Sequence, residues 1–195
     1  MSDYYDWTPT VLMDKPLALI GPPSCPYADV GYDLAALSGL SLINLDQWIE
    51  HHVGQSLWHL IQTEGETTYR RLETAFLPKA LSAKPPSILI LGDGALLNPA
   101  NKHQLLISST LVYCKLRPST VYWHLQQNTN SVESKPHPLA PSTLEHPDQL
   151  RPLLEPRLAG YQQAHRTIDM EEKSIRDAVQ LLLQTMQALD LFKSD

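Results

Sequence analysis

The chain has 195 residues and a formal net charge of −6, with 43% hydrophobic and 18% charged residues. This length and composition suit one domain with a sizeable core. The 15 lysines and arginines are scattered, which argues against a nucleic-acid partner or an anionic membrane surface. No apolar run is long enough to span a bilayer, and the acidic, aromatic N-terminus does not resemble a signal peptide. We therefore expect a cytoplasmic protein.

Four short apolar runs predict strands of a parallel sheet, because near-continuous hydrophobic strands are typical where helices cover both faces, and a fifth, less apolar segment is expected to add another strand. Between the runs lie helical patterns. One starts near Val30 and stops at Gly39, a second covers residues 67–83, and a C-terminal helix is capped by Ser174. The alternation predicts an α/β fold with three layers (αβα) around a five-stranded parallel sheet. The expected strands are Leu17–Ile20, Leu42–Leu45, Ile88–Leu91, Leu111–Leu116 and Arg166–Asp169.

Two segments fall outside this alternation. Residues 1–16 have the character of an N-terminal extension ending at Pro16, so we expect residues 17–195 to form the domain. Residues 126–147 are polar, contain four prolines and lack periodicity. An irregular insert of this length in a compact domain is typical of a lid.

The turn after the first expected strand has the layout of a phosphate-binding loop, G-x-x-x-x-G-K-[ST], with most of its functional residues missing. Gly21 keeps the first glycine, but Pro26, Tyr27 and Ala28 replace the second glycine, the lysine and the Ser/Thr. Such a loop holds phosphate through backbone N–H groups, a lysine and a hydroxyl on Mg²⁺. In this chain the prolines of the loop have no N–H to donate, and Asp29 adds a negative charge beside any bound anion. We expect no cofactor here, and ATP–Mg²⁺ only if the loop still binds it. The alternative is a strand–turn–helix that never bound phosphate.

Five segments, read in order, carry a resemblance to a known family. The most specific is Glu64-Gly65-Glu66 followed by Tyr69-Arg70-Arg71-Leu72-Glu73, which is close to E-G-E-x-x-F-R-x-x-E. The others cover residues 21–37, 44–56, 92–99 and 157–161. Together they resemble shikimate kinase, a small phosphate-binding-loop kinase with the nucleoside-monophosphate-kinase fold, over residues 17–185.

The resemblance implies a pocket for a shikimate-like acid and a place in aromatic amino-acid biosynthesis. Asp46 matches the family's aspartate that accepts hydrogen bonds from ring hydroxyls. Arg70 and Arg157 match two arginines that clamp the substrate carboxylate through paired N–H bonds. Gly92 and Gly94 match two of the three positions of a glycine turn. The resemblance therefore implies a largely intact acceptor pocket.

In the nucleotide half, by contrast, the chain departs from the family's pattern. Asn44 replaces the first aspartate of D-x-D, which serves the metal region in the family. His137 replaces a lid arginine in the run of residues 135–140, and Asp93 replaces the middle glycine of the turn. An alternative role for Tyr27 is to fill the vacated phosphate hole with its ring.

Local roles compete with these assignments. Arg70 would pair with Glu66 or Glu73 as a surface arginine at helical spacing. Asp46 would only cap the helix after it, and Asp93 would only satisfy N–H groups of its turn. The alignment at Arg157 is loose.

The preferred hypothesis is a pseudoenzyme that has lost ATP–Mg²⁺ but keeps a pocket for a small carboxylate ligand such as shikimate. Its role would be to sense or sequester that ligand or to dock on a protein partner. A second hypothesis is an active enzyme on a small hydroxy acid, either a kinase with an unusual donor or a non-kinase enzyme with Asp46 as base. A third is a purely structural interaction module. No metal site is expected, since His51 and His52 are adjacent on a helix and face different ways.

Overall fold

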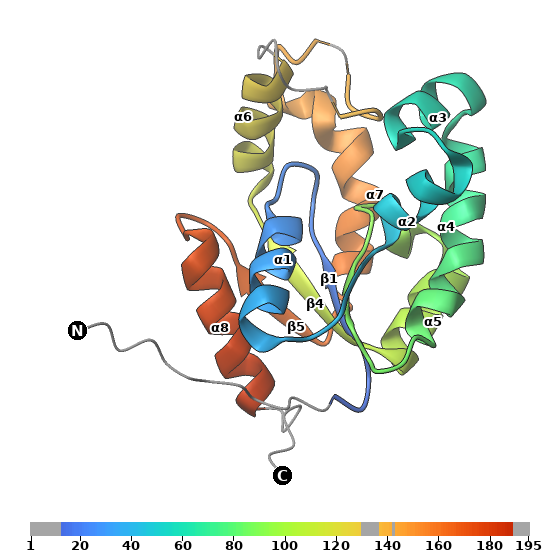
Figure 1. Ribbon diagram of the computed structural model, residues 1–195. Coiled ribbons are helices and arrows are strands. Elements are labelled where there is room, and N and C mark those ends of the chain that lie inside the picture. Colours follow the sequence, from blue (N-terminus) through green and yellow to red (C-terminus); the bar gives the residue numbers. More distant parts are fainter. Residues whose placement is uncertain (1–12, 130–136, 142, 189–195) are drawn as a thin grey trace.

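The computed structural model describes residues 13–129, 137–141 and 143–188 (Figure 1). Five strands form one sheet in the order β2–β3–β1–β4–β5, and all neighbouring pairs are parallel. The predicted α/β fold with a five-stranded parallel sheet is confirmed: β1 and β5 have the predicted bounds, β2 and β3 end one residue earlier than predicted, and β4 lies one residue earlier in the chain. The strands are β1 (Leu17–Ile20), β2 (Leu42–Asn44), β3 (Ile88–Ile90), β4 (Thr110–Lys115) and β5 (Arg166–Asp169).

Helices connect the strands, and several of their ends carry the predicted signals. Gly39 ends the first helix with φ of 69°, a left-handed conformation that favours glycine, and the Ser174 hydroxyl accepts the N–H of Asp177 at the start of the last. The α-helices are α1 (Tyr27–Ser38), α2 (Leu45–Val53), α3 (Leu57–Glu64), α4 (Glu66–Leu81), α5 (Pro99–Ser108), α6 (Pro118–Thr129), α7 (Arg151–Tyr161) and α8 (Ile175–Ala188), with short 3₁₀ helices η1 (Ala95–Leu97) and η2 (Pro147–Leu150).

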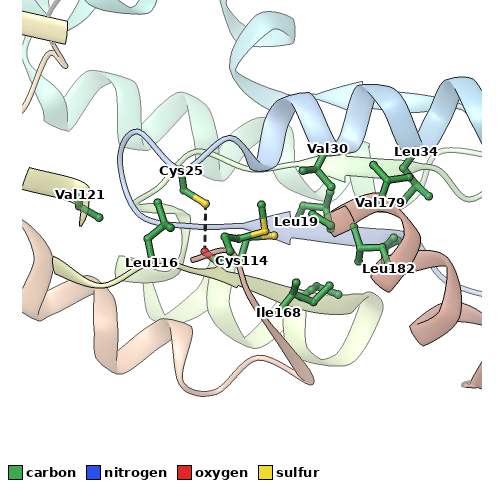
Figure 2. Close-up of a cluster of buried hydrophobic side chains, with 14 of the residues drawn as sticks. Leu19, Cys25, Val30, Leu34, Cys114, Leu116, Val121, Ile168, Val179 and Leu182 are labelled. Carbon is green, nitrogen blue, oxygen red and sulfur yellow. Dashed lines mark hydrogen bonds between the residues drawn. The ribbon is translucent and has the colours of Figure 1, made fainter. Parts of the chain in front are cut away.

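Alternate residues of each strand point to opposite faces of the sheet, and each face has its own core. On one face, Leu19 of β1 packs with Val30 of α1 and Val179 of α8, in the cluster that Figure 2 shows. On the other face, Ile20 of β1 packs in a cluster that includes Ile49 of α2 and residues of α4 and α5. The predicted three-layer arrangement follows from these two buried faces.

The two cysteines are free thiols, and both are packed in the first of these cores. Both are buried, and the Cys25 Sγ lies 3.5 Å from the carbonyl oxygen of Cys114, to which it donates (Figure 2). Burial raises the pKa of the Cys25 thiol to about 12 and also raises that of Cys114. Neither thiol is an activated nucleophile, because the reactive form is the thiolate.

The two segments outside the alternation are only partly described. Residues 1–12 lie outside the described residues, whereas Met13 is buried in the core beside α8 and β1. In the expected lid, residues 126–129 continue helix α6, and residues 130–136 and 142 lie outside the described part. Among the helices of the described residues, none is long and apolar enough to cross a membrane.

Candidate functional site

A cavity of about 440 Å³ opens at the carboxyl ends of the strands, between the loop after β1, helices α2 and α3, and the turn after β3. Ligand sites of open α/β sheets gather at this edge, because the loops that follow parallel strands meet there. Tyr27, Asp46 and Asp93 line the cavity, so the fold brings together three positions that lie far apart in the sequence. Trp58 and His137 also lie in its wall.

In the loop between β1 and α1, the Tyr27 ring at the end of the loop lies against Gly21 at its start. A side chain at Gly21 would come within 2.7 Å of the Tyr27 ring and 2.8 Å of the Cys114 carbonyl oxygen, so the ring and backbone occupy the space above this glycine. The Tyr27 hydroxyl donates to the carbonyl oxygen of Leu91 at 2.9 Å. Burial and the nearby carboxylates of Asp93 and Asp46 raise the Tyr27 pKa well above its ordinary value. The side chain is therefore a neutral phenol that bridges the ends of β1 and β3.

The backbone of this loop offers few free donors. Pro22, Pro23 and Pro26 have no N–H, and the N–H of Cys25 is bonded to the Pro22 carbonyl oxygen at 3.1 Å. Pro26 sits at the N-terminal end of α1 without a side-chain cap, and Ala28 follows in the first turn with no hydroxyl to offer.

Asp46 lies in the first turn of α2, where it faces the cavity. The cap of this helix is the Asn44 side chain, whose oxygen accepts the N–H groups of Asp46 and Gln47 at 3.1 and 3.2 Å. The Asp46 Oδ1 accepts the hydroxyl of Tyr69 at 2.8 Å. Burial raises the pKa of Asp46 to about 6 against the lowering effect of that hydrogen bond. The Asp46 carboxylate therefore does not cap the helix and lies in the wall of the cavity.

Arg70 makes the local ion pairs that the sequence offered as the alternative to a ligand role. Its Nε donates to Glu66 at 3.0 Å and its Nη1 to Glu73 at 3.1 Å, the pairing expected at helical spacing. Its Nη2 also lies 3.8 Å from Oδ1 of Asp93. Only 16% of the side chain is exposed, so Arg70 is not a surface arginine. Burial raises the pKa of Glu73 to about 7 despite the contact with Arg70.

Arg157 reaches the same turn from helix α7. Its side chain is 5% exposed, its Nη1 donates to the Leu153 carbonyl oxygen at 2.7 Å, and its Nε lies 3.3 Å from Oδ2 of Asp93. The structure thus places both predicted clamp arginines around one point.

The side chain at that point is Asp93, which the sequence assigned only to its own turn. The imidazole Nε2 of His137 lies 3.3 Å from Oδ2 of this carboxylate, which is therefore surrounded by His137, Arg157 and Arg70. Burial would raise the pKa of Asp93, but contact with His137 and the two guanidinium charges lowers it to about 2. The carboxylate is ionised and lies between the two arginines that the sequence matched to a substrate clamp.

The two glycines of the turn lie close against side chains of helix α4. A side chain at Gly92 would collide with the Tyr69 hydroxyl, and one at Gly94 would collide with the Arg70 guanidinium. Whether these glycines, Asp46 and the arginines contact a ligand stays a prediction.

Sequence reasoning missed two tyrosines that hold the site together. The Tyr161 hydroxyl donates to the Gly21 carbonyl oxygen at 3.0 Å and lies within reach of the Asp93 carbonyl oxygen, and its ring stacks on Tyr113. Tyr69 supports Asp46 through its hydroxyl. The signal for Tyr69 was available, since it stands where the family pattern has phenylalanine. Tyr161 was also marked, since it matches the last residue of the family's R-x-P-L-Y, but its hydrogen-bond partners are backbone atoms distant in sequence and could not be read from the motif.

Within the described residues, no group of three or more His, Cys, Asp or Glu side chains is arranged to hold a metal ion. The histidines at positions 51 and 52 lie in α2, and the ring of His52 packs against Phe76 instead.

Comparisons with known proteins identify the family of the chain. A family model described as shikimate kinase matches residues 28–187. Shikimate kinase 2 of Salmonella paratyphi B is 31% identical over 161 residues, which cover 80% of this chain and 84% of that protein. The structure of shikimate kinase from Acinetobacter baumannii in complex with shikimate aligns with a TM-score of 0.77 and 28% identity, over 89% of this chain and 93% of that one. Shikimate kinase from Aquifex aeolicus has a TM-score of 0.73 at 22% identity, over 90% and 98% of the two chains, and supports the fold alone. The chain therefore belongs to the shikimate kinase family.

Proposed function

We propose that this member of the shikimate kinase family binds a small hydroxylated ring in the cavity beside Asp46 and does not transfer phosphate to it from ATP–Mg²⁺. The observation that carries the proposal is the position of Tyr27. Its ring covers Gly21 and its hydroxyl is bonded to Leu91, where a phosphate-binding loop would present a lysine and free N–H groups.

The residues of this site do not fit ATP–Mg²⁺. The loop has three prolines without N–H groups and no lysine. Ala28 supplies no hydroxyl for a metal ion, and the Asn44 side chain is engaged as the cap of α2 and as a donor to Tyr32. With neither a cation nor a metal ligand, the loop lacks the groups that offset the charge of a triphosphate.

The charge of the cavity acts in the same direction. The ionised carboxylate of Asp93 and the carboxyl of Asp46 both line the cavity next to the loop. Two like charges about 4 Å apart repel by roughly 4 kcal/mol at an effective dielectric constant near 20. A phosphate group placed over Tyr27 would therefore meet repulsion with little to compensate it.

The acceptor half supports a binding role. Tyr69 uses one oxygen of Asp46, and a carboxylate can accept further hydrogen bonds from ring hydroxyls. The related kinase of Acinetobacter baumannii was solved with shikimate bound. We propose that this chain senses or sequesters a shikimate-like ring in the cytoplasm, or presents the bound state to a protein partner.

Thermal unfolding and a coupled phosphorylation assay test the proposal. ATP–Mg²⁺ should leave the Tm unchanged and give no turnover with shikimate. A variant that combines Pro26→Gly, Tyr27→Lys and Ala28→Ser restores the loop pattern and should gain ATP–Mg²⁺ binding. At 100 times its dissociation constant a ligand stabilises a protein by about 2.7 kcal/mol, which is readily measured.

The matched control is Tyr32→Lys, which makes the same exchange at an exposed tyrosine of the same helix and should gain nothing. Stabilisation of the wild-type protein by ATP–Mg²⁺, or phosphorylation of shikimate, would refute the proposal.

A further inference from the structure

Two guanidinium groups from different helices converge on one internal carboxylate. Arg70 comes from α4 and Arg157 from α7, and they lie 3.8 and 3.3 Å from the two oxygens of Asp93. The Asp93 side chain is 11% exposed and the Arg157 side chain 5%. Paired arginines hold the carboxylate of a ligand through parallel N–H bonds, and here the two guanidinium groups enclose an internal carboxylate by charge, without such bonds.

From this convergence we propose that Asp93 is a built-in occupant of the Arg70–Arg157 clamp, and that the cavity beside it takes a hydroxylated ring that carries no carboxylate. The proposal deepens the proposed function and rests on it, since it names the ligand class of the same cavity.

Within the described residues, both guanidinium groups of the clamp already contact carboxylates of the chain itself. Three carboxylates, from Glu66, Glu73 and Asp93, contact the two guanidinium groups. The pKa of Asp93 is held at about 2 by His137 and the arginines against the opposing effect of burial. A ligand carboxylate that entered the clamp would add a further negative charge to a cluster that is already balanced or acidic.

The lining of the cavity points to the same ligand class. The carboxylates of Asp46, Glu50 and Asp93 lie in its wall, whereas Arg70 and Arg157 do not. His137 is the basic side chain among the described residues that line it. Such a wall offers hydrogen-bond acceptors to the hydroxyl or amine groups of a ring and repels a carboxylate.

The hydrogen bonds of the clamp show that Asp93 fills it imperfectly. The Nη2 atom of Arg70 and the Nε and Nη2 atoms of Arg157 are buried and make no hydrogen bond within the described residues. Asp93 therefore neutralises the guanidinium groups without satisfying their geometry. An external carboxylate is free to orient for paired N–H bonds, so it should bind once the Asp93 side chain is removed.

Position 93 is the place in this turn from which a carboxylate can reach both arginines. A side chain at Gly92 would collide with Tyr69, and one at Gly94 would collide with Arg70 itself. The replacement of a single glycine at the middle of the turn thus converts a carboxylate clamp into a closed ion cluster.

The experiment compares shikimate with its methyl ester, which keeps the hydroxylated ring but masks the carboxylate. Calorimetric titration of the wild-type protein should show binding of the ester and binding of shikimate at least tenfold weaker. The Asp93→Gly variant should reverse this preference, with shikimate bound at least tenfold more tightly than the ester. Adding Arg157→Lys to that variant should abolish the reversal, because an ammonium cannot form the paired bonds of a guanidinium.

Asp148→Gly is the matched control, since it also removes a carboxylate that contacts a histidine and an arginine, His146 and Arg151, but at an exposed position. It should leave the preference for the ester unchanged. If Asp93→Gly unfolds, Asp93→Asn serves instead, because it keeps the side-chain size, removes the charge and should reduce the preference for the ester severalfold.

A wild-type preference for shikimate overturns the proposal, as does an Asp93→Gly variant without a gain in shikimate binding. No nucleotide is used, so this failure is distinct from that of the proposed loss of ATP–Mg²⁺ binding.

Discussion

The loop after β1 and the turn after β3 face the same cavity but have diverged in different ways. The loop lacks binding groups, and a neutral tyrosine ring covers what remains. The turn keeps both clamp arginines and adds a charged side chain between them. Loss of hydrogen-bond donors weakens a binding site directly. A carboxylate of the chain itself, such as that of Asp93, leaves the binding arginines in position but occupies the space between them. Under the two proposals above, the same family scaffold loses one ligand and changes another by unrelated physical means.

The comparison also predicts how strongly each region supports the fold. In the turn, charged groups are buried together, so removal of one member leaves the others unpaired. In the loop, a neutral phenol makes one hydrogen bond. The turn should therefore be more sensitive to substitution than the loop, and the following predictions test that order.

The largest effect is expected for Arg157→Met, which removes a buried cation and leaves the Asp93 carboxylate short of a partner. Loss of one member of a buried pair costs about 3–5 kcal/mol of unfolding free energy. Arg151→Met on the same helix is the control, because that side chain is 66% exposed and its replacement should change stability by less than about 0.5 kcal/mol. Urea denaturation measures both. Equal effects at the two positions would show that the cluster does not support the fold.

An intermediate effect is expected in the pH dependence of stability. The pKa of Asp46 is raised to about 6 in the folded protein from an ordinary 3.8, so its contribution to stability is fully present below about pH 3.8 and is lost as pH rises through 6. The difference in unfolding free energy between the wild-type protein and Asp46→Asn should therefore change by up to about 3 kcal/mol between pH 4 and pH 7.

Asp93 titrates in the opposite sense. Its pKa is lowered to about 2, so its contribution is present above about pH 3.8 and is lost as pH falls through 2. Urea midpoints at pH 4, 5, 6 and 7 separate the two carboxyl groups. A wild-type minus Asp46→Asn difference that stays constant over this range would contradict the assignment to Asp46.

The smallest effect is expected in the loop. Tyr27→Phe keeps the ring over Gly21 but leaves the Leu91 carbonyl oxygen without its hydroxyl donor, at a cost of about 1–2 kcal/mol. Tyr32→Phe, at a tyrosine with 37% exposure on the same helix, should cost less than about 0.5 kcal/mol. Thermal unfolding of both variants checks the difference. A loss at Tyr27 as large as that at Arg157 would reverse the order of the two regions.

Local signals determined much of the architecture. The apolar run that became β1, the glycine that ends α1 and the serine that caps α8 follow from burial and backbone conformation within a few residues. Parallel strands with covered faces then require the three-layer fold. The order of the motif segments was enough to identify the family, and the family model and relatives confirm it.

Only the tertiary structure decided what the site contains. The sequence placed Asp46, Arg70 and Arg157 in one pocket, but the ion pair between Asp93 and Arg157 joins residues on separate elements, the turn after β3 and helix α7. The hydrogen bonds of Tyr161 to the loop and the turn likewise have no local signature. Such contacts depend on how strands and helices pack at the sheet edge. The effect of a charged side chain on binding and stability depends on the partners that this packing brings within a few ångströms.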